Sequence, residues 1–175
     1  MAYLVQRRAF GAGAIASAAA LLLGGQVARA ALAAPTGKVI QTMSGTLKET
    51  NQDGNAVFDM AMLEAIGLTS FTTVTPWYTG PVKFEGVPMA KLLDRVGATG
   101  TTVTALALND YRTDIPIEDF RKYPAILATK RDGEYMPVKD KGPLFIVYPY
   151  DSDPTLKHQV YYSRSAWQVA RLIVK

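Results

Sequence analysis

The sequence predicts an α+β fold made mostly of strands, with two short helices packed against them. Three observations support this class. Most apolar segments are short, rich in β-branched residues and bounded by turn residues, as strands are. Only two segments carry start and stop signals of a helix. The 175 residues, 49% of them hydrophobic, suffice for one domain and leave little room for a second.

The first predicted elements are a strand and a helix joined by a turn. Residues 39–47 alternate between two faces as a strand does, and the dipeptide Asp53-Gly54 marks the turn. A short helix is predicted over 59–66, because Asp59 can cap its free amides and Gly67 can end it.

The second predicted helix follows two more strands. Residues 70–75 are rich in β-branched side chains, and residues 82–84 form a further short strand. Pro88 starts the helix at its first position, where the missing N–H of proline costs nothing. The apolar side chains that follow recur at the spacing of one buried helix face: Met89, Leu92, Leu93 and Val96.

The rest of the chain predicts strands and turns. Asp132-Gly133 is the strongest hairpin signal in the sequence, because this dipeptide favours the tight turns that join antiparallel strands. Asn109, Asp110 and Tyr111 form a polar turn between two apolar runs. The predicted strands of this part cover residues 103–108, 126–131, 135–138, 144–148 and 168–174.

The N-terminus has the properties of an export signal. Arg7 and Arg8 precede an uncharged run over 12–25 that is too short to span a membrane. A small-x-small motif predicts cleavage after Ala30, which leaves residues 31–38 as a flexible leader. The Arg-Arg-x-Phe core resembles the twin-arginine signal, and an ordinary secretory signal is the alternative. We therefore expect a periplasmic protein that is not integral to the membrane.

The composition excludes several classes of function. The chain has no Cys and one His, which rules out disulfides, thiolate–metal sites, Cys nucleophiles and His-rich metal sites. Its formal net charge of +4 includes three arginines of the export signal, so that the remaining chain is nearly neutral. Because it lacks an excess of basic residues, we expect no nucleic-acid binding.

Several short motifs occur in a specific order along residues 39–175. They are Phe84-Glu85-Gly86-Val87-Pro88-Met89, Asn109-Asp110-Tyr111, Leu127-Ala128, Asp132-Gly133, Lys141-Gly142-Pro143-Leu144 and Trp167. In this order and spacing they resemble the molybdopterin-binding domain of the sulfite oxidase family. The resemblance implies that residues 39–175 form one compact α+β domain with a curved mixed β-sheet and short helices.

The sequence departs from this family at the metal ligand. The family has a Cys four residues before a Trp, and the thiolate binds molybdenum; here Thr73 and Trp77 hold these positions. A Thr hydroxyl loses its proton far less readily than a thiol and is a poor ligand for a soft metal. Phe145 and Ala166 stand where the family tends to have basic residues. We therefore expect no molybdenum, no metal site and no catalytic residue of the usual sulfite-oxidising kind.

Small members of the family without the Cys occur in bacterial envelopes, and the resemblance to them implies a function. The chain would bind a pterin-like molecule without metal and report it to an inner-membrane signalling protein of cyclic di-GMP metabolism. Two alternatives stay open. One is an oxidoreductase subunit that carries a molybdenum cofactor without a protein sulfur ligand, and the other is a non-catalytic scaffold that docks other proteins.

A pterin is a flat, hydrogen-bonding bicycle, so its site needs an aromatic face and a few polar partners. Trp77 is either the ring that stacks on the ligand or a core tryptophan. Thr73 and Thr75 either offer hydroxyls to the pocket or only form a strand. The remaining candidate ligand-binding residues lie in the polar turn and in a late segment: Asn109, Asp110, Tyr111, Tyr162, Ser163 and Arg164. The alternatives for these residues are ordinary turn chemistry and, for Arg164, a solvated surface position.

Overall fold

The structure is a computed structural model that describes residues 31–175, and these residues form one compact unit. Residues 1–30, which contain the predicted export signal, lie outside the described residues. Within the described part of the chain, no helix is both long and apolar enough to cross a membrane.

The predicted leader over residues 31–38 contains no helix or strand, yet it is bonded to the rest of the chain. The backbone N–H groups of Thr36 and Gly37 donate to the carboxylate of Asp59, at 2.9 and 2.8 Å. The same carboxylate caps the first helix by accepting from the N–H of Met62 at 2.9 Å. One buried Asp therefore holds both the leader and the helix start.

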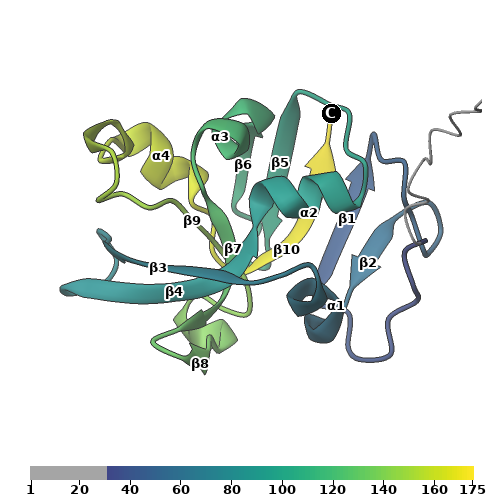
Figure 1. Cartoon of the computed structure of the whole chain (residues 1–175), viewed down its shortest axis with the longest axis horizontal. Coiled ribbons are helices and arrows are strands. Elements are labelled where there is room, and N and C mark those ends of the chain that lie inside the picture. The colour runs from purple at the N-terminus through teal and green to yellow at the C-terminus, as the bar shows by residue number, and fades with distance from the viewer. Residues whose placement is uncertain (1–30) are drawn as a thin grey trace, which may run out of the picture. The chain divides into compact units, whose positions relative to one another are not determined.

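The first sheet has five strands in the order β2-β1-β10-β5-β6 (Figure 1). The central strands β1 and β10 run parallel, and all other neighbours in this sheet are antiparallel. The sheet is therefore mixed, and it brings the two ends of the domain side by side. Its strands are β1 (Gln41–Gly45), β2 (Ala56–Phe58), β5 (Thr102–Ala107), β6 (Arg112–Pro116) and β10 (Val169–Val174).

The second sheet is antiparallel throughout, with the order β3-β4-β7-β8 and with β9 paired to β7. In Figure 1 the strands β3 and β4 extend as a long ribbon away from the first sheet. Its strands are β3 (Thr69–Val74), β4 (Pro81–Pro88), β7 (Ile126–Arg131), β8 (Glu134–Tyr135) and β9 (Phe145–Val147).

Both predicted helices are present, as α1 (Met60–Ala65) and α2 (Met89–Arg95). The expectation of only two helices is wrong, because α3 (Ile117–Lys122) and α4 (Gln159–Arg164) also form. Each has six residues, too few to show a helical period, and α4 buries none of its side chains. Two short 3₁₀ turns complete the helical elements: η1 (Val138–Asp140) and η2 (Pro154–Leu156).

The α+β class is confirmed, and the predicted strands match observed ones, although they divide between two sheets. Strands β2 and β6 were not predicted, because β2 has three residues, all buried, and β6 is an edge strand with charged side chains. The strand predicted over 135–138 is wrong in its second half, where Val138 begins a 3₁₀ turn. Strand β4 continues past the predicted end at residue 84 as far as Pro88.

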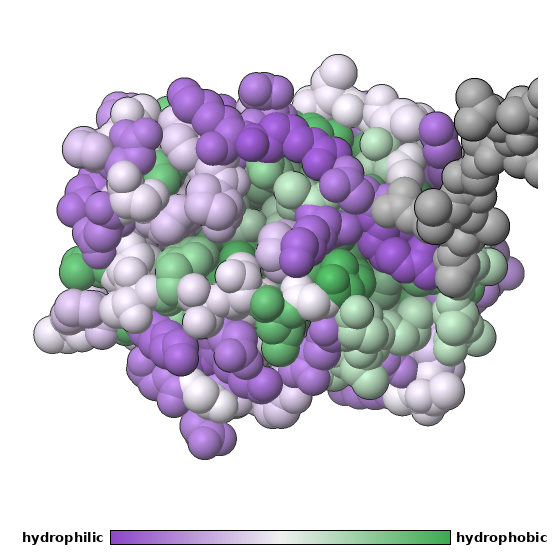
Figure 2. Space-filling model, in the orientation of Figure 1, coloured by the Kyte–Doolittle hydropathy of each residue, from purple (hydrophilic) through white to green (hydrophobic). Residues whose placement is uncertain are grey.

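One hydrophobic core joins both sheets and the helices. Leu92 and Leu93 of α2 are fully buried in it, as their spacing predicts. Phe84 and Phe145 of the second sheet are also fully buried, and Phe145 makes an edge contact with Trp77 at 5.3 Å between ring centroids. The core thus continues into a partly exposed aromatic cluster. Figure 2 shows that apolar side chains also reach the surface, in patches between hydrophilic ones.

Candidate functional site: an aromatic pocket

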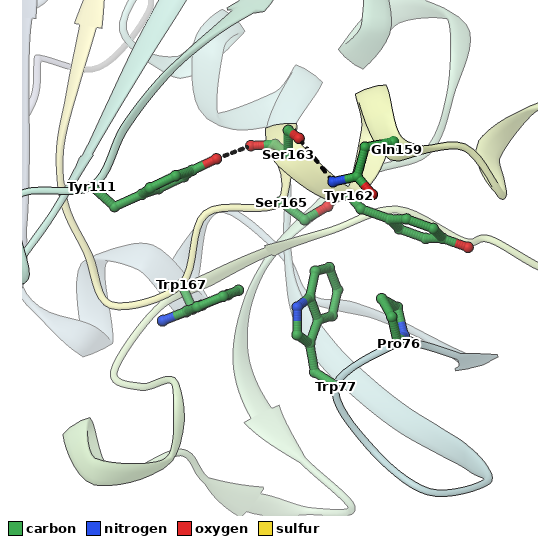
Figure 3. A pocket seen from close by; sticks show the side chains of 8 residues that line it. All are labelled: Pro76, Trp77, Tyr111, Gln159, Tyr162, Ser163, Ser165 and Trp167. Carbon is green, nitrogen blue, oxygen red and sulfur yellow. Dashed lines mark hydrogen bonds between the residues drawn. The ribbon is translucent and has the colours of Figure 1, made fainter.

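An open pocket of about 260 Å³ lies where three separate segments meet (Figure 3). The first segment follows β3, the second is the turn between β5 and β6, and the third is α4 with the residues after it. The residues that line the pocket are Pro76, Trp77, Tyr111, Gln159, Tyr162, Ser163, Ser165 and Trp167.

The turn between β5 and β6 places Tyr111 at the pocket. Asp110 adopts a left-handed conformation, with φ of 64°, and its N–H donates to the Ala107 carbonyl at 3.2 Å. The side-chain oxygen of Asn109 accepts from the N–H of Tyr111 at 3.2 Å. This is the turn chemistry that Asn and Asp favour. The hydroxyl of Tyr111 then donates to the backbone carbonyl of Ser163 at 2.7 Å, which ties the turn to α4.

Tyr111 and Trp167 form two walls of a slot. Their rings are nearly parallel, with 6° between the planes, and the centroids are 6.4 Å apart. Figure 3 shows the two rings facing one another with open space between them. Two flat rings in contact with a third ring between them need roughly 7 Å, since each van der Waals contact takes about 3.5 Å. Because the gap between the ring planes cannot exceed the distance between their centroids, the slot is at least about half an ångström narrower than a flat ring requires.

Trp77 forms the inner end of the pocket and also belongs to the core cluster. Its ring makes edge contacts with Phe145, Tyr150, Tyr162 and Trp167, at centroid distances of 5.3, 6.2, 6.0 and 5.7 Å. Edge-to-face packing of this kind is favourable and restricts ring motion. Trp77 thus packs against the core cluster and also lines the pocket, whereas its stacking on a ligand stays a prediction.

The polar groups of the pocket come mainly from α4 and the residue after it. The side-chain amide of Gln159 donates to the Ser163 hydroxyl at 3.3 Å, and the buried Ser165 hydroxyl donates to the Tyr161 carbonyl at 2.8 Å. Ser165 also shares a hydrogen bond with the hydroxyl of Tyr150. Burial raises the pKa of Tyr150, so this phenol stays neutral. The pocket therefore offers hydroxyl and amide groups and no ionised side chain.

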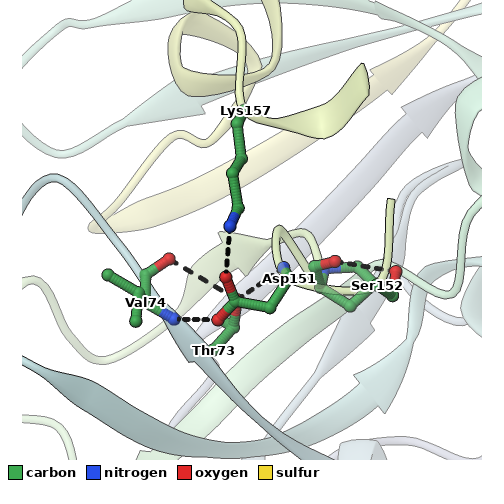
Figure 4. A network of polar contacts seen from close by, with 6 residues as sticks. Thr73, Val74, Asp151, Ser152 and Lys157 are labelled. Atoms are coloured by element: carbon green, nitrogen blue, oxygen red, sulfur yellow. Dashed lines mark hydrogen bonds and ion pairs between the residues drawn. The ribbon is translucent and has the colours of Figure 1, made fainter. Parts of the chain in front are cut away.

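Thr73 stands at the position of the family's metal ligand, but its hydroxyl is hydrogen-bonded to the carboxylate of Asp151 (Figure 4). It is buried, and its hydroxyl donates to Asp151 Oδ2 at 3.2 Å. The same carboxylate oxygen accepts from the N–H of Val74 at 2.7 Å, while Lys157 Nζ lies 2.7 Å from the other oxygen. Lys157 and the Val74 N–H lower the pKa of Asp151, so the carboxylate is ionised at neutral pH.

These residues do not fit a molybdenum ion. Thr73 is 1% exposed and its hydroxyl is bonded to a carboxylate, whose negative charge opposes the deprotonation of the hydroxyl that a metal–oxygen bond at Thr73 would require. Phe145 and Ala166, at the positions of the family's basic residues, are both fully buried and offer no charge to an anionic group. We therefore derive no chemical step through a metal at this site.

Two other candidates from the sequence lie outside the pocket lining. Thr75 is buried and its hydroxyl accepts from the N–H of Trp77 at 3.4 Å. Arg164 Nη1 lies 2.8 Å from Asp119 Oδ2, and the buried hydroxyl of Tyr148 donates to the same oxygen at 3.1 Å. Arg164 thus anchors α4 to α3 and is not a solvated surface residue.

The structure brings together four of the nine candidates at this pocket: Trp77, Tyr111, Tyr162 and Ser163. Asn109 and Asp110 shape the turn that presents Tyr111. The predicted site residues did not include Pro76, Gln159, Ser165 or Trp167, although Trp167 is part of the family pattern. For Gln159 and Ser165 no sequence signal exists, because their role depends on how α4 packs.

The fold and the pocket define a class of protein: a small α+β domain with an open pocket lined by aromatic side chains. In a comparison with protein families, residues 36–151 match the oxidoreductase molybdopterin binding domain. The chain belongs to this family, the molybdopterin-binding domain of sulfite oxidase type. No curated protein matches it.

Proposed function

We propose that this protein binds a flat, pterin-like ring compound in the slot between Tyr111 and Trp167, without a metal ion, and serves as a periplasmic sensor. The observation that carries the proposal is the near-parallel pair of rings with centroids 6.4 Å apart at the mouth of a pocket. Aromatic rings gain most from stacking on other flat conjugated rings, which a pterin provides.

The polar lining supports a hydrogen-bonding ring rather than a plain hydrocarbon. The amide of Gln159 and the hydroxyl of Ser163 lie at the pocket and can exchange hydrogen bonds with amino, ring-nitrogen and carbonyl groups. The volume of about 260 Å³ suits a small compound rather than a large substrate.

The Asp151 contact supports binding without metal, because the position of the usual thiolate ligand holds a buried hydroxyl bonded to a carboxylate. The pocket lining also contains no His, Asp, Glu, Lys or Arg that could act as a general acid or base. This set of side chains supports a role in binding.

Sensing in the periplasm, through an inner-membrane signalling partner of cyclic di-GMP metabolism, is the function that combines these features. It is supported by the export signal in the sequence and by the resemblance to family members that lack the Cys. The family match itself favours a second candidate, an oxidoreductase subunit that holds a molybdenum cofactor without protein sulfur. Molybdenum analysis of protein made in a host with intact cofactor synthesis separates the two, because only the second requires one atom per chain.

Ligand identification and a binding measurement test the proposal. We expect mass spectrometry of protein extracted from the periplasm to detect a pterin. We also expect calorimetry to detect binding of neopterin as a probe, weakened by about tenfold or more in Tyr111→Leu and Trp167→Leu. Tyr135→Leu is the matched control, because Tyr135 is 52% exposed and lies on the second sheet outside the pocket. The absence of both a bound pterin and neopterin binding would contradict the proposal and favour a docking scaffold.

A further inference from the structure

A second cavity lies apart from the aromatic pocket, beside β1 and β10 of the first sheet, and also has a volume of about 260 Å³. Val39, Leu108 and Val138 reach it and remain 39%, 55% and 51% exposed. We call this cavity the apolar groove; it is lined by Lys38, Val39, Ile40, Thr42, Leu108, Val138, Pro143, Val169, Ala170 and Arg171.

We propose that the apolar groove docks a protein segment whose apolar side chains are flanked by carboxylates, and that a ligand in the Tyr111–Trp167 slot controls this docking. The proposal rests on the proposed function, because it requires that the slot binds a ligand. It adds the chemistry of the partner and the route by which the partner detects the ligand.

The charges around the groove select the partner. Lys38 and Arg171 are the charged residues of its lining, both are exposed, and both are positive. Among residues 31–175, no ion pair joins either of them to a carboxylate. An apolar surface with two cations at its rim is complementary to a segment that carries both apolar and acidic side chains.

The exposure of the groove favours a protein segment over a small amphiphile. Three apolar side chains remain between 39% and 55% exposed, so a hydrocarbon tail lying there would stay largely in water. A protein segment covers such a surface with its own backbone and neighbouring side chains. Exposed apolar side chains gathered at one place on a surface are typical of interaction sites.

The groove and the slot share the same two chain segments. Leu108 of the groove and Tyr111 of the slot are the two ends of one turn. On the other side, Val169 of the groove is separated from Trp167 of the slot by the single residue Gln168. Each wall of the slot is therefore continuous with one wall of the groove.

Gln168 connects these segments through three hydrogen bonds. Its carbonyl accepts from the N–H of Leu108 at 2.9 Å, and its own N–H donates to the Lys141 carbonyl at 3.0 Å. Its side-chain amide donates to the carbonyl of Val138 at 2.7 Å. Gln168 thus links the segment of Trp167 to two groove residues, Leu108 and Val138, and it holds a left-handed conformation with φ of 53°.

The width of the slot provides the driving force for the coupling. A flat ring needs roughly 7 Å between Tyr111 and Trp167, and their centroids are 6.4 Å apart. The gap between the parallel rings is no wider than the distance between their centroids, so a flat ligand must push them at least about half an ångström apart. Because Gln168 joins both segments to Val138, the same displacement reaches the walls of the groove.

A fluorescence experiment tests the coupling. The chain has no Cys, so Val138→Cys places one environment-sensitive dye in the groove, and Lys91→Cys places the same dye on the exposed side of α2 as a control. We expect neopterin to shift the emission of the dye at position 138, with the midpoint that calorimetry gives for binding, and to leave the dye at position 91 unchanged. If neopterin binds and the dye at 138 does not respond, the coupling is wrong although the proposed function stands.

A peptide experiment tests the docking without any ligand for the slot. The probe is a short labelled peptide in which leucines alternate with aspartates, compared with the same peptide carrying lysines. We expect the acidic peptide to bind about tenfold or more tightly than the basic one. Leu108→Asp and Arg171→Glu should each weaken binding of the acidic peptide by at least a similar factor. Val160→Asp is the control and should leave this binding unchanged, because Val160 is 43% exposed on α4 and lies outside the groove.

Three outcomes would overturn the docking proposal. The first is equal binding of the acidic and the basic peptide. The second is an equal loss of affinity for the acidic peptide in Val160→Asp and Leu108→Asp. The third is a dimer in sedimentation that Leu108→Asp dissociates, because the groove would then serve a second copy of this chain. If neopterin fails to bind and the acidic peptide binds as described, the proposed function falls and the docking surface stands.

Discussion

The hydroxyl of Thr73 donates a hydrogen bond to the carboxylate of Asp151 across 78 positions of sequence, at 3.2 Å. The contact joins the end of β3, which leads to Trp77, to the loop that leads through Lys157 to α4. These are two of the three segments that form the aromatic pocket. The position of the family's metal ligand thus serves here to hold two walls of the pocket together.

Removal of the Asp151 charge is expected to loosen this junction. In Asp151→Asn the Val74 N–H and Lys157 lose a charged acceptor, and we expect the free energy of unfolding to fall by a modest amount, since the side chain is partly exposed. Urea denaturation measures the change. Asp94→Asn, which breaks only an exposed pair with Arg121, is the control and should change stability by less. Equal effects in the two variants would contradict the special role of Asp151.

Replacement of Thr73 by Cys is expected not to restore a molybdenum site. The Asp151 carboxylate next to position 73 disfavours the thiolate that a soft metal requires. We expect Thr73→Cys, made in a host with intact cofactor synthesis, to contain far less than one molybdenum atom per chain by elemental analysis. Stoichiometric molybdenum in this single variant would show that Asp151 is no obstacle.

The partly buried ion pair of Arg164 and Asp119 is expected to contribute more to stability than an exposed pair. In Arg164→Met the Asp119 carboxylate stays buried beside Tyr148 without its cation, and we expect a loss of about 2 kcal/mol in thermal or urea unfolding. Arg121→Met breaks the exposed pair with Asp94 and should cost less. The double variant Arg164→Met/Asp119→Asn should lose less free energy of unfolding than the sum of the losses in Arg164→Met alone and Asp119→Asn alone. Additive losses would refute a direct interaction.

Stability is expected to fall at acid pH partly through Asp59. The N–H groups of Met62, Gly37 and Thr36 lower its pKa in the folded protein, so the carboxylate stabilises the fold above the pKa of the unfolded chain. That contribution is lost as the pH falls below about 4 and through the lowered folded value. We expect Tm measured from pH 6 to pH 2.5 to fall less steeply in Asp59→Asn than in the wild type. Asp53→Asn, at a turn position without side-chain hydrogen bonds among the described residues, should keep the wild-type slope.

Local signals in the sequence were sufficient for the elements that they describe. Asp59 caps α1 as predicted, the Met89–Val96 stripe is buried, and the Asp132-Gly133 turn joins β7 to β8. Elements without such signals were missed, because α4 buries no side chain and β2 is too short to alternate. The family assignment was also available from the ordered motifs and is confirmed.

The sequence alone determined the α+β class, the family and the absence of any thiol that could bind a metal, because each depends on residue identity or on neighbours along the chain. Only the tertiary structure decided that Thr73 is bonded to Asp151, that Arg164 is held by Asp119, and that Tyr111 faces Trp167. These contacts arise when strand pairing brings distant segments together. A local pattern of apolar and polar residues carries no information on which distant side chain will be the partner.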